Sequence, residues 1–201
     1  RSSLRTFFGW CHAAGYAPRN AAALVQRARC GAVLGRILTP DEQARLEATV
    51  ADAVGEEAER DRMMIGVLLG CGLRVGSLVA LAAEDLHDGV IEVRRAKNDA
   101  PVRVFVPRAL RPSLDAYVAR CEGRLFPVTP RHVGRRLRHW CEVAGIPPAS
   151  PHALRRTFGT RLYAACQDPL VVMRGLGHRS LVSCLPYVAG VEERLRAVMG
   201  V

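Results

Sequence analysis

Three short segments of the chain carry arginine and histidine side chains that could act on a phosphate. Arg74 follows an apolar segment, Arg155 lies three residues after His152, and His178 closes the sequence Leu-Gly-His. Two guanidinium groups can clamp the non-bridging oxygens of a phosphodiester, and a histidine can donate a further hydrogen bond. Because histidine titrates near neutral pH, His152 could accept a proton or hold the phosphate. These residue types favour chemistry at a phosphodiester.

A tyrosine oxygen could serve as the nucleophile of such a reaction and hold the phosphate covalently. The chain has four tyrosines: Tyr16, Tyr117, Tyr163 and Tyr187. Residue type does not choose among them, and Tyr163 lies on the same predicted helix as Arg155.

Lys97 is the only lysine among 29 basic side chains. A lysine ammonium can release its proton, whereas a guanidinium effectively cannot, so Lys97 is a candidate general acid for a departing alkoxide. The alternative is a solvated turn residue, which is the ordinary role of a lysine next to Asn and Asp.

The 201-residue chain has a formal net charge of +10, and the surplus lies at its two ends. Residues 1–36 carry no acidic side chain, and residues 89–201 carry 19 basic against 8 acidic ones. This pattern favours a polyanionic partner such as nucleic acid. The longest apolar run, residues 63–73, is far shorter than the roughly 18 residues of a membrane span, so no membrane association is expected.

Seven cysteines are scattered along the chain without a CxxC pair, which indicates core residues in a reducing cytoplasm. No carboxylate cluster that could hold Mg²⁺ lies near the arginine and histidine segments, so the sequence predicts chemistry without a metal or other cofactor. The first residue is Arg1 rather than Met, and we therefore expect a processed product or a fragment.

The elements that position these residues are mostly helical. Thr39-Pro40-Asp41-Glu42 predicts a capped helix start, and GVIEVRR and VRVFV predict a β-hairpin with Lys97 at its tip. Residues 18–36 are predicted to form a linker with one short helix. The other predicted helices lie near residues 4–15, 61–71, 108–121, 131–144, 151–166, 169–176 and 191–199, and a short segment follows Ser180.

Four separated pieces resemble the motifs of tyrosine recombinases, the phage integrase family. Residues 70–75 (GCGLRV) are similar to the first-arginine box, residues 152–158 (HALRRTF) to the His-x-x-Arg box, and residues 176–178 to the Leu-Gly-His box. Tyr187 follows His178 by nine residues, the family's spacing for its nucleophile, and the family's hairpin also carries a catalytic lysine. The elements occur in the family's order.

The resemblance implies a mostly α fold with a small antiparallel β-sheet, the catalytic fold of tyrosine recombinases. It implies residues 1–31 as the end of a core-binding domain with its linker, and residues 32–201 as the catalytic domain. The expected activity is site-specific DNA recombination, in integration or excision, through a 3′-phosphotyrosine. A homo-tetramer on paired sites, exchanging residues 190–201, and a cytoplasmic, nucleoid-associated location are also expected. The alternatives are a type IB topoisomerase or a catalytically silent DNA-binding regulator.

The family register selects six catalytic residues: Arg74, Lys97, His152, Arg155, His178 and Tyr187. Each has a structural alternative, such as an arginine beside a helix end or a histidine in a first helical turn. Three positions depart from the family pattern. Ser77 stands where an acidic residue is common, Arg156 stands where histidine is common and is expected near the DNA backbone, and Pro186 could interrupt the helix of Tyr187.

Overall fold

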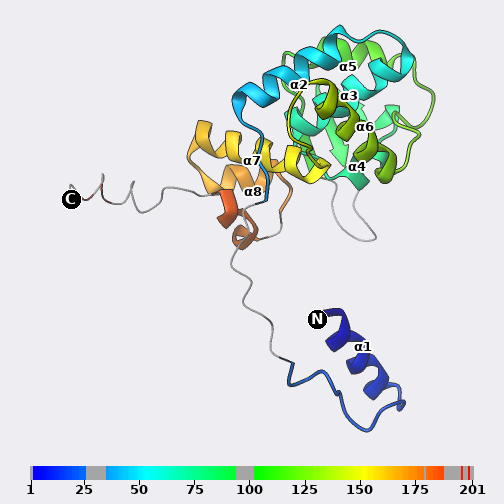
Figure 1. Ribbon diagram of the computed structural model, residues 1–201, viewed down its shortest axis with the longest axis vertical. Helices are drawn as coiled ribbons and strands as arrows, with labels where there is room; N and C mark the ends of the chain where they lie inside the picture. The colour runs from blue at the N-terminus through cyan, green and yellow to red at the C-terminus, as the bar shows by residue number, and fades with distance from the viewer. Residues whose placement is uncertain are drawn as a thin grey trace. The chain divides into compact units, whose positions relative to one another are not determined.

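The structure, a computed structural model, describes residues 2–25, 35–93, 102–178 and 180–187, together with Arg196 and Met199. The chain divides into residues 1–34 and residues 35–201 (Figure 1). In the first unit, helix α1 (Ser2–Ala13) is followed by turns, and the Arg5 guanidinium donates a 3.1 Å hydrogen bond to the Ala23 carbonyl. Up to residue 25 these turns contain no helix; the rest of the predicted linker lies largely outside the described residues.

The second unit is mostly helical with one small sheet, as predicted. Strands β1 (Leu86–His87), β2 (Val90–Val93) and β3 (Val102–Phe105) pair antiparallel in the order β1-β2-β3. Two 3₁₀ segments, η1 (Ala83–Asp85) and η2 (Leu181–Tyr187), accompany the helices. The α-helices are α2 (Pro40–Asp52), α3 (Glu56–Cys71), α4 (Val75–Ala80), α5 (Arg111–Val118), α6 (Pro130–Val143), α7 (Pro151–Cys166) and α8 (Pro169–Gly175).

Four of these helices begin with the same local signal, a polar N-cap followed by proline. Thr39 and Glu42 form the predicted capping box of α2, in which each side chain bonds the other residue's backbone N–H. The side chains of Thr129, Ser150 and Asp168 each accept one backbone N–H bond from the first turn of α6, α7 and α8, respectively. Proline fits the first helical position because that N–H has no partner within the helix.

Most apolar side chains belong to one core around α3, which packs against α2, α6 and α7. Met64, Leu68 and Phe126 are almost fully buried there. A second, smaller core lies between α7, α8 and η2 (Figure 1). It consists of Tyr163, Val172, Leu176, Cys184 and Tyr187. Segment η2 is therefore held against α7 and α8 by its own set of apolar contacts.

The structure corrects several predicted boundaries. Helix α3 begins at Glu56 rather than near Asp61. The glutamates of its first turn, Glu56, Glu57 and Glu59, stabilise this start because their negative charges lie at the positive end of the helix dipole. Helix α5 is shorter than predicted. Helix α4, with six residues, and strand β1, with two, were not predicted, because such short segments show no clear period.

The predicted hairpin is confirmed as the β2–β3 pair, with Val93 opposite Val102. Its tip, including Lys97, lies outside the described residues, and so does the predicted tail helix at 191–199 apart from Arg196 and Met199. Among the described residues, no helix is long and apolar enough to cross a membrane.

Candidate active site

The turn between α3 and α4 presents Arg74. Gly72 ends α3 with φ of +63°, a left-handed conformation that glycine adopts without strain. Any side chain here would also collide with Phe158, because a Cβ atom would lie 2.2 Å from its ring. Two residues later, Arg74 begins α4 with an extended backbone and an exposed side chain. Within the part of the chain that the structure describes, the Arg74 side chain has no hydrogen-bond or ion-pair partner, and its carbonyl accepts a bond from the Leu78 N–H.

Arg155 on α7 is buried, with 4% of its surface exposed. Its guanidinium donates two 2.6 Å hydrogen bonds, one to the Gly72 carbonyl and one to the Leu176 carbonyl. Among the described residues no carboxylate pairs with it. Burial, together with the positive charge of Arg74, lowers the pKa of Arg155 to about 10. The site thus holds a buried, uncompensated positive charge, which favours an anion.

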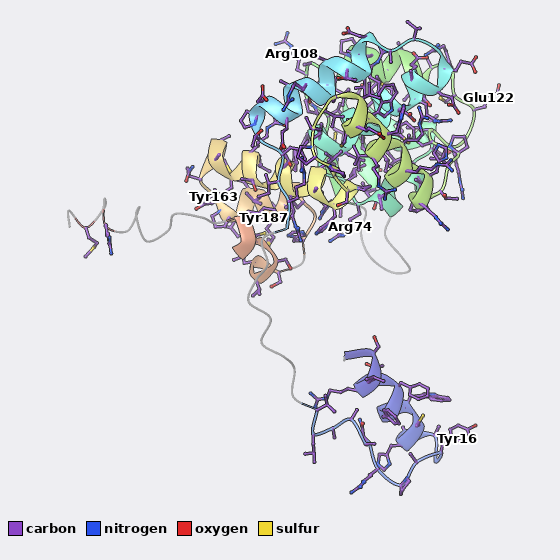
Figure 2. All side chains as sticks on the ribbon, viewed as in Figure 1. Tyr16, Arg74, Arg108, Glu122, Tyr163 and Tyr187 are labelled. Carbon is purple, nitrogen blue, oxygen red and sulfur yellow. The ribbon has the colours of Figure 1, made fainter. Side chains whose placement is uncertain are left out.

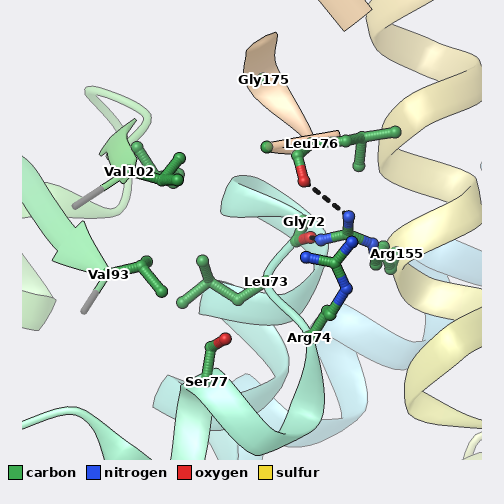
Figure 3. Close-up of a pocket in the computed structure, with 11 residues that line it drawn as sticks. Gly72, Leu73, Arg74, Ser77, Val93, Val102, Arg155, Gly175 and Leu176 are labelled. Carbon is green, nitrogen blue, oxygen red and sulfur yellow. Dashed lines mark hydrogen bonds between the residues drawn. The ribbon is translucent and has the colours of Figure 1, made fainter. Parts of the chain in front are cut away.

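A pocket of about 220 Å³ opens beside the two arginines (Figure 3). The guanidinium groups of Arg74 and Arg155 lie next to each other at one side of it. Val93 and Val102, the residues that flank the hairpin tip, line it as well. The loop that contains Lys97 therefore starts and ends at this pocket, although Lys97 itself lies outside the described residues.

His178 follows α8 through a tight turn in which its backbone N–H donates to the Met173 carbonyl. Its Nδ1 lies 3.4 Å from the Cys184 sulfur, and its ring stacks at 6.3 Å from the ring of Tyr187. Burial lowers the pKa of His178 to about 4, and the charges of Arg155 and Arg74 act in the same direction. The imidazole is therefore neutral at physiological pH and can donate or accept a hydrogen bond.

Tyr187 is buried at the end of η2, beside α7 (Figure 2). Its ring packs on Gly159, where an added Cβ would lie 2.8 Å from Cε1. Burial raises the pKa of the phenol, whereas the charges of Arg155, Arg156 and Arg74 lower it. Burial is the larger effect, so the pKa of the phenol is raised overall, and the arginine charges offset part of the cost of forming the nucleophilic phenolate.

The other tyrosines of the catalytic unit have different surroundings. Tyr117 donates a 3.1 Å hydrogen bond to the Leu125 carbonyl and stacks on Phe126 in the main core. The pKa of Tyr117 is raised to about 12, and burial is the main cause. Tyr163 is buried in the same small core as Tyr187. Proximity to the site therefore excludes Tyr117 and leaves Tyr163 as a competitor of Tyr187.

His152 occupies the first turn of α7, one helical turn before Arg155. Partial burial lowers its pKa, and the charges of Arg156, Arg155 and Arg74 lower it further. His152 therefore shares the electrostatic environment of the two arginines. The structure thus brings five of the six candidate residues to one region: Arg74, His152, Arg155, His178 and Tyr187.

The three departures from the family pattern each have a defined place. Ser77 lines the pocket next to Arg74. The Arg156 guanidinium lies against Gly35, where a Cβ would be 1.2 Å from its nitrogen. Segment η2, which is a 3₁₀ segment rather than an α-helix, includes Pro186 and is described as far as Tyr187. A 3₁₀ segment of seven residues has few N–H bonds that proline could remove.

Sequence reasoning missed two residues of the site, Gly159 and Cys184. Gly159 could have been found, because it lies one helical turn after Arg155 and on the same face of the predicted helix. Cys184 carried no signal beyond its position three residues before Tyr187. Where the structure describes the chain, no three His, Cys, Asp or Glu side chains lie close enough together to hold a metal ion.

A second basic feature lies on α6. Exposed Arg131, Arg135 and Arg138 surround a hollow of about 600 Å³. On the opposite face of α6, Arg136 and Trp140 both donate hydrogen bonds to the buried carboxylate of Asp61 on α3. This contact fixes the orientation of the basic face.

The profile of the phage integrase family matches residues 36–193. A XerC tyrosine recombinase of Rhodospirillum centenum is 32% identical over 98% of the chain and 62% of its own length. A XerD tyrosine recombinase of Pseudomonas aeruginosa is 32% identical over 97% of the chain and 71% of its own length. The chain therefore spans a little over 60% of the first of these relatives.

Solved structures show the same fold. The XerA recombinase is 24% identical, with a TM-score of 0.68 over 87% of the chain and 65% of its own. A XerH site-specific recombinase, bound to a palindromic difH substrate in a post-cleavage complex, has a TM-score of 0.73 at 19% identity over 87% of the chain and 55% of its own. The fold is thus that of tyrosine recombinase catalytic domains. The chain belongs to the phage integrase family.

Proposed function

We propose that the chain is the catalytic part of a site-specific tyrosine recombinase that cuts and rejoins double-stranded DNA through a 3′-phosphotyrosine. One observation carries this proposal. Among the described residues, a buried guanidinium without a carboxylate partner lies next to a second guanidinium, and its charge acts on a neutral histidine and a buried tyrosine. This arrangement fits a tetrahedral phosphate whose charge increases during the reaction.

The proposed reaction starts with attack of the Tyr187 oxygen on the scissile phosphorus. Arg74 and Arg155 bind the non-bridging oxygens, and His178 donates a hydrogen bond to one of them. His152 accepts the phenolic proton or holds the phosphate. The bond from phosphorus to the 5′-oxygen breaks, and Lys97 gives that oxygen a proton. Attack of a 5′-hydroxyl on the phosphotyrosine then reverses these steps, so no bond energy is lost.

The remaining parts of the proposal concern DNA and assembly. The α6 arginines and the net charge of +10 suit the phosphate backbone. Residues 1–31 would be the end of a core-binding domain and residues 32–201 the catalytic domain, acting on nucleoid DNA in the cytoplasm.

Residues 190–201 would pack on a neighbouring protomer in a tetramer on paired sites. Deleting them should impair assembly on paired sites, measured by light scattering, more than single-site cleavage; unchanged assembly would refute the exchange.

The test is a covalent trap in the native host. Rapid denaturation should recover DNA attached to Tyr187. Sequencing this DNA identifies the cleavage site, which is then built into nicked suicide substrates for assays in vitro. Tyr187→Phe should bind DNA without forming the adduct. Tyr163→Phe, a matched change in the same small core, should still form it.

Other results of the trap would contradict the proposal. An adduct on Tyr163 would refute the nucleophile assignment. DNA binding by the wild-type chain without any adduct would identify a silent regulator. Relaxation of plain supercoiled DNA by a monomer would identify a topoisomerase.

A further inference from the structure

Cys184 is a buried thiol of the site that the proposed reaction does not use. It is 0% exposed and lies in η2, three residues before Tyr187. Side chains three residues apart lie on one face of a 3₁₀ segment. That face presents both the Cys184 thiol and the Tyr187 ring to His178, the thiol at 3.4 Å from Nδ1 and the ring in a stack.

We infer that Cys184 is a positioning residue for His178: its thiol donates a hydrogen bond to Nδ1 and so keeps the imidazole proton on Nε2. A neutral histidine carries one proton, and the bond made by one ring nitrogen decides which nitrogen holds it. With Nδ1 as the acceptor, Nε2–H is the donor that remains for an anion. This inference rests on the proposed function, in which His178 donates to the scissile phosphate.

The protonation states of the two groups support this direction of the bond. Burial lowers the pKa of His178, and the charges of Arg155, Arg74 and His152 act in the same direction; the titratable groups that contact its ring are Cys184 and Tyr187. Burial raises the pKa of the Cys184 thiol, although Arg155 opposes this effect. Both partners are therefore neutral near pH 7.

Between two neutral partners, the relative acceptor strengths decide which group donates the hydrogen bond. An imidazole nitrogen is a good acceptor, whereas a thiol sulfur is a weak one. If Nδ1–H donated to sulfur, the S–H group would need another acceptor. Among the described residues, the Cys184 sulfur has no hydrogen-bond partner other than His178. The bond from S–H to Nδ1 satisfies both groups.

The first test is spectroscopic and needs no DNA. Two-bond ¹H–¹⁵N correlation spectra of the ¹⁵N-histidine-labelled chain at pH 7, assigned with His178→Gln, should show Nδ1 as the unprotonated nitrogen and Nε2 as the protonated one. Cys184→Ser keeps a donor and should give the same pattern. Cys184→Ala should give a mixture of the two tautomers. A wild-type His178 with its proton on Nδ1 would overturn the inference.

The second test is the single-turnover cleavage rate on a nicked suicide substrate that carries the trapped site. Cys184→Ala should lower the rate about 10-fold, on the scale of other groups that orient functional histidines, and Cys184→Ser should restore most of it. Cys141→Ala is the matched control, because Cys141 is also 0% exposed but lies in the main core. It should cleave at the wild-type rate.

The two readouts separate the possible failures. If the wild-type chain forms no adduct, the proposed function fails while the spectra still test the hydrogen bond. If the wild type cleaves but Cys184→Ala matches it in both rate and spectrum, Cys184 only fills space and the inference is wrong. An equal loss of rate in Cys184→Ala and Cys141→Ala would also contradict it, because general loosening of a core would then explain the defect.

Discussion

Replacing Gly159 by alanine should displace the nucleophile without unfolding the protein. The added Cβ would lie 2.8 Å from Cε1 and 3.0 Å from Cδ1 of Tyr187. Carbon atoms pack best at about 3.5–4.0 Å, so the ring has to retreat by about 0.7 Å or more. Because a misplacement of about 1 Å can cost about 100-fold in rate, we expect Gly159→Ala to cleave about 10-fold to 100-fold more slowly.

The effect on stability should be smaller. Overpacking costs about 1–3 kcal/mol, and alanine regains about 1 kcal/mol over glycine within a helix. A net loss of up to about 2 kcal/mol leaves a domain of ordinary stability almost entirely folded. A slow variant would therefore report the position of Tyr187 rather than the fraction of folded protein.

The assay is single-turnover cleavage of the nicked substrate, with DNA binding measured separately by gel shift. Gly66→Ala is the matched control: it makes the same change inside α3, and its Cβ would lie 3.0 Å from a methyl group of Leu110, away from the site. This control should cleave like the wild type. A folded Gly159→Ala that binds and cleaves DNA at the wild-type rate would show that the contact does not position the nucleophile.

Three further predictions address stability and proton transfer. Asp61→Ala leaves Arg136 and Trp140 without their buried acceptor and should lower the unfolding free energy by about 3–5 kcal/mol in urea titrations; a loss below about 1 kcal/mol would contradict this role. The folded chain holds the pKa of His178 near 4 rather than 6.5, so the unfolding free energy of the DNA-free protein should fall by about 1–3 kcal/mol as pH falls from about 6.5 to about 4. His178→Gln should lose less unfolding free energy over this range, and equal losses in the two proteins would refute the role of His178. Lys97→Ala and Lys97→Arg should both slow cleavage about 10²- to 10⁴-fold, and a substrate with sulfur as the bridging 5′-atom should restore the rate; an undiminished defect would show that Lys97 acts in binding.

Local signals were sufficient for the parts of the fold that depend on a few neighbouring residues. The Thr39 capping box, the hairpin strands and the end of α3 at Gly72 all follow from short-range chemistry, and all are found. Helix α4 and strand β1 were not predictable in this way, because they are short and depend on packing against the rest of the unit. Tertiary contacts, rather than propensity, decide such segments.

The site was predictable in its residue types but not in its internal contacts. The resemblance to the family's motifs selected Arg74, Arg155, His178 and Tyr187, and the structure brings them together. The bond from Cys184 to His178 and the contact of Tyr187 with Gly159 join different elements. No periodicity within one helix or strand encodes such contacts, so they emerge only from the folded arrangement.

Arg155 connects the separate motifs physically. Its two acceptors, the carbonyls of Gly72 and Leu176, each lie two residues before another site residue, Arg74 in one case and His178 in the other. These bonds span 83 and 21 positions of the sequence. One buried side chain thus fixes the backbone of both turns and supplies charge to the pocket between them. Because the arginine that would bind the phosphate also holds the other two groups in place, a lysine at position 155 could keep the charge but not both carbonyl bonds in the same geometry.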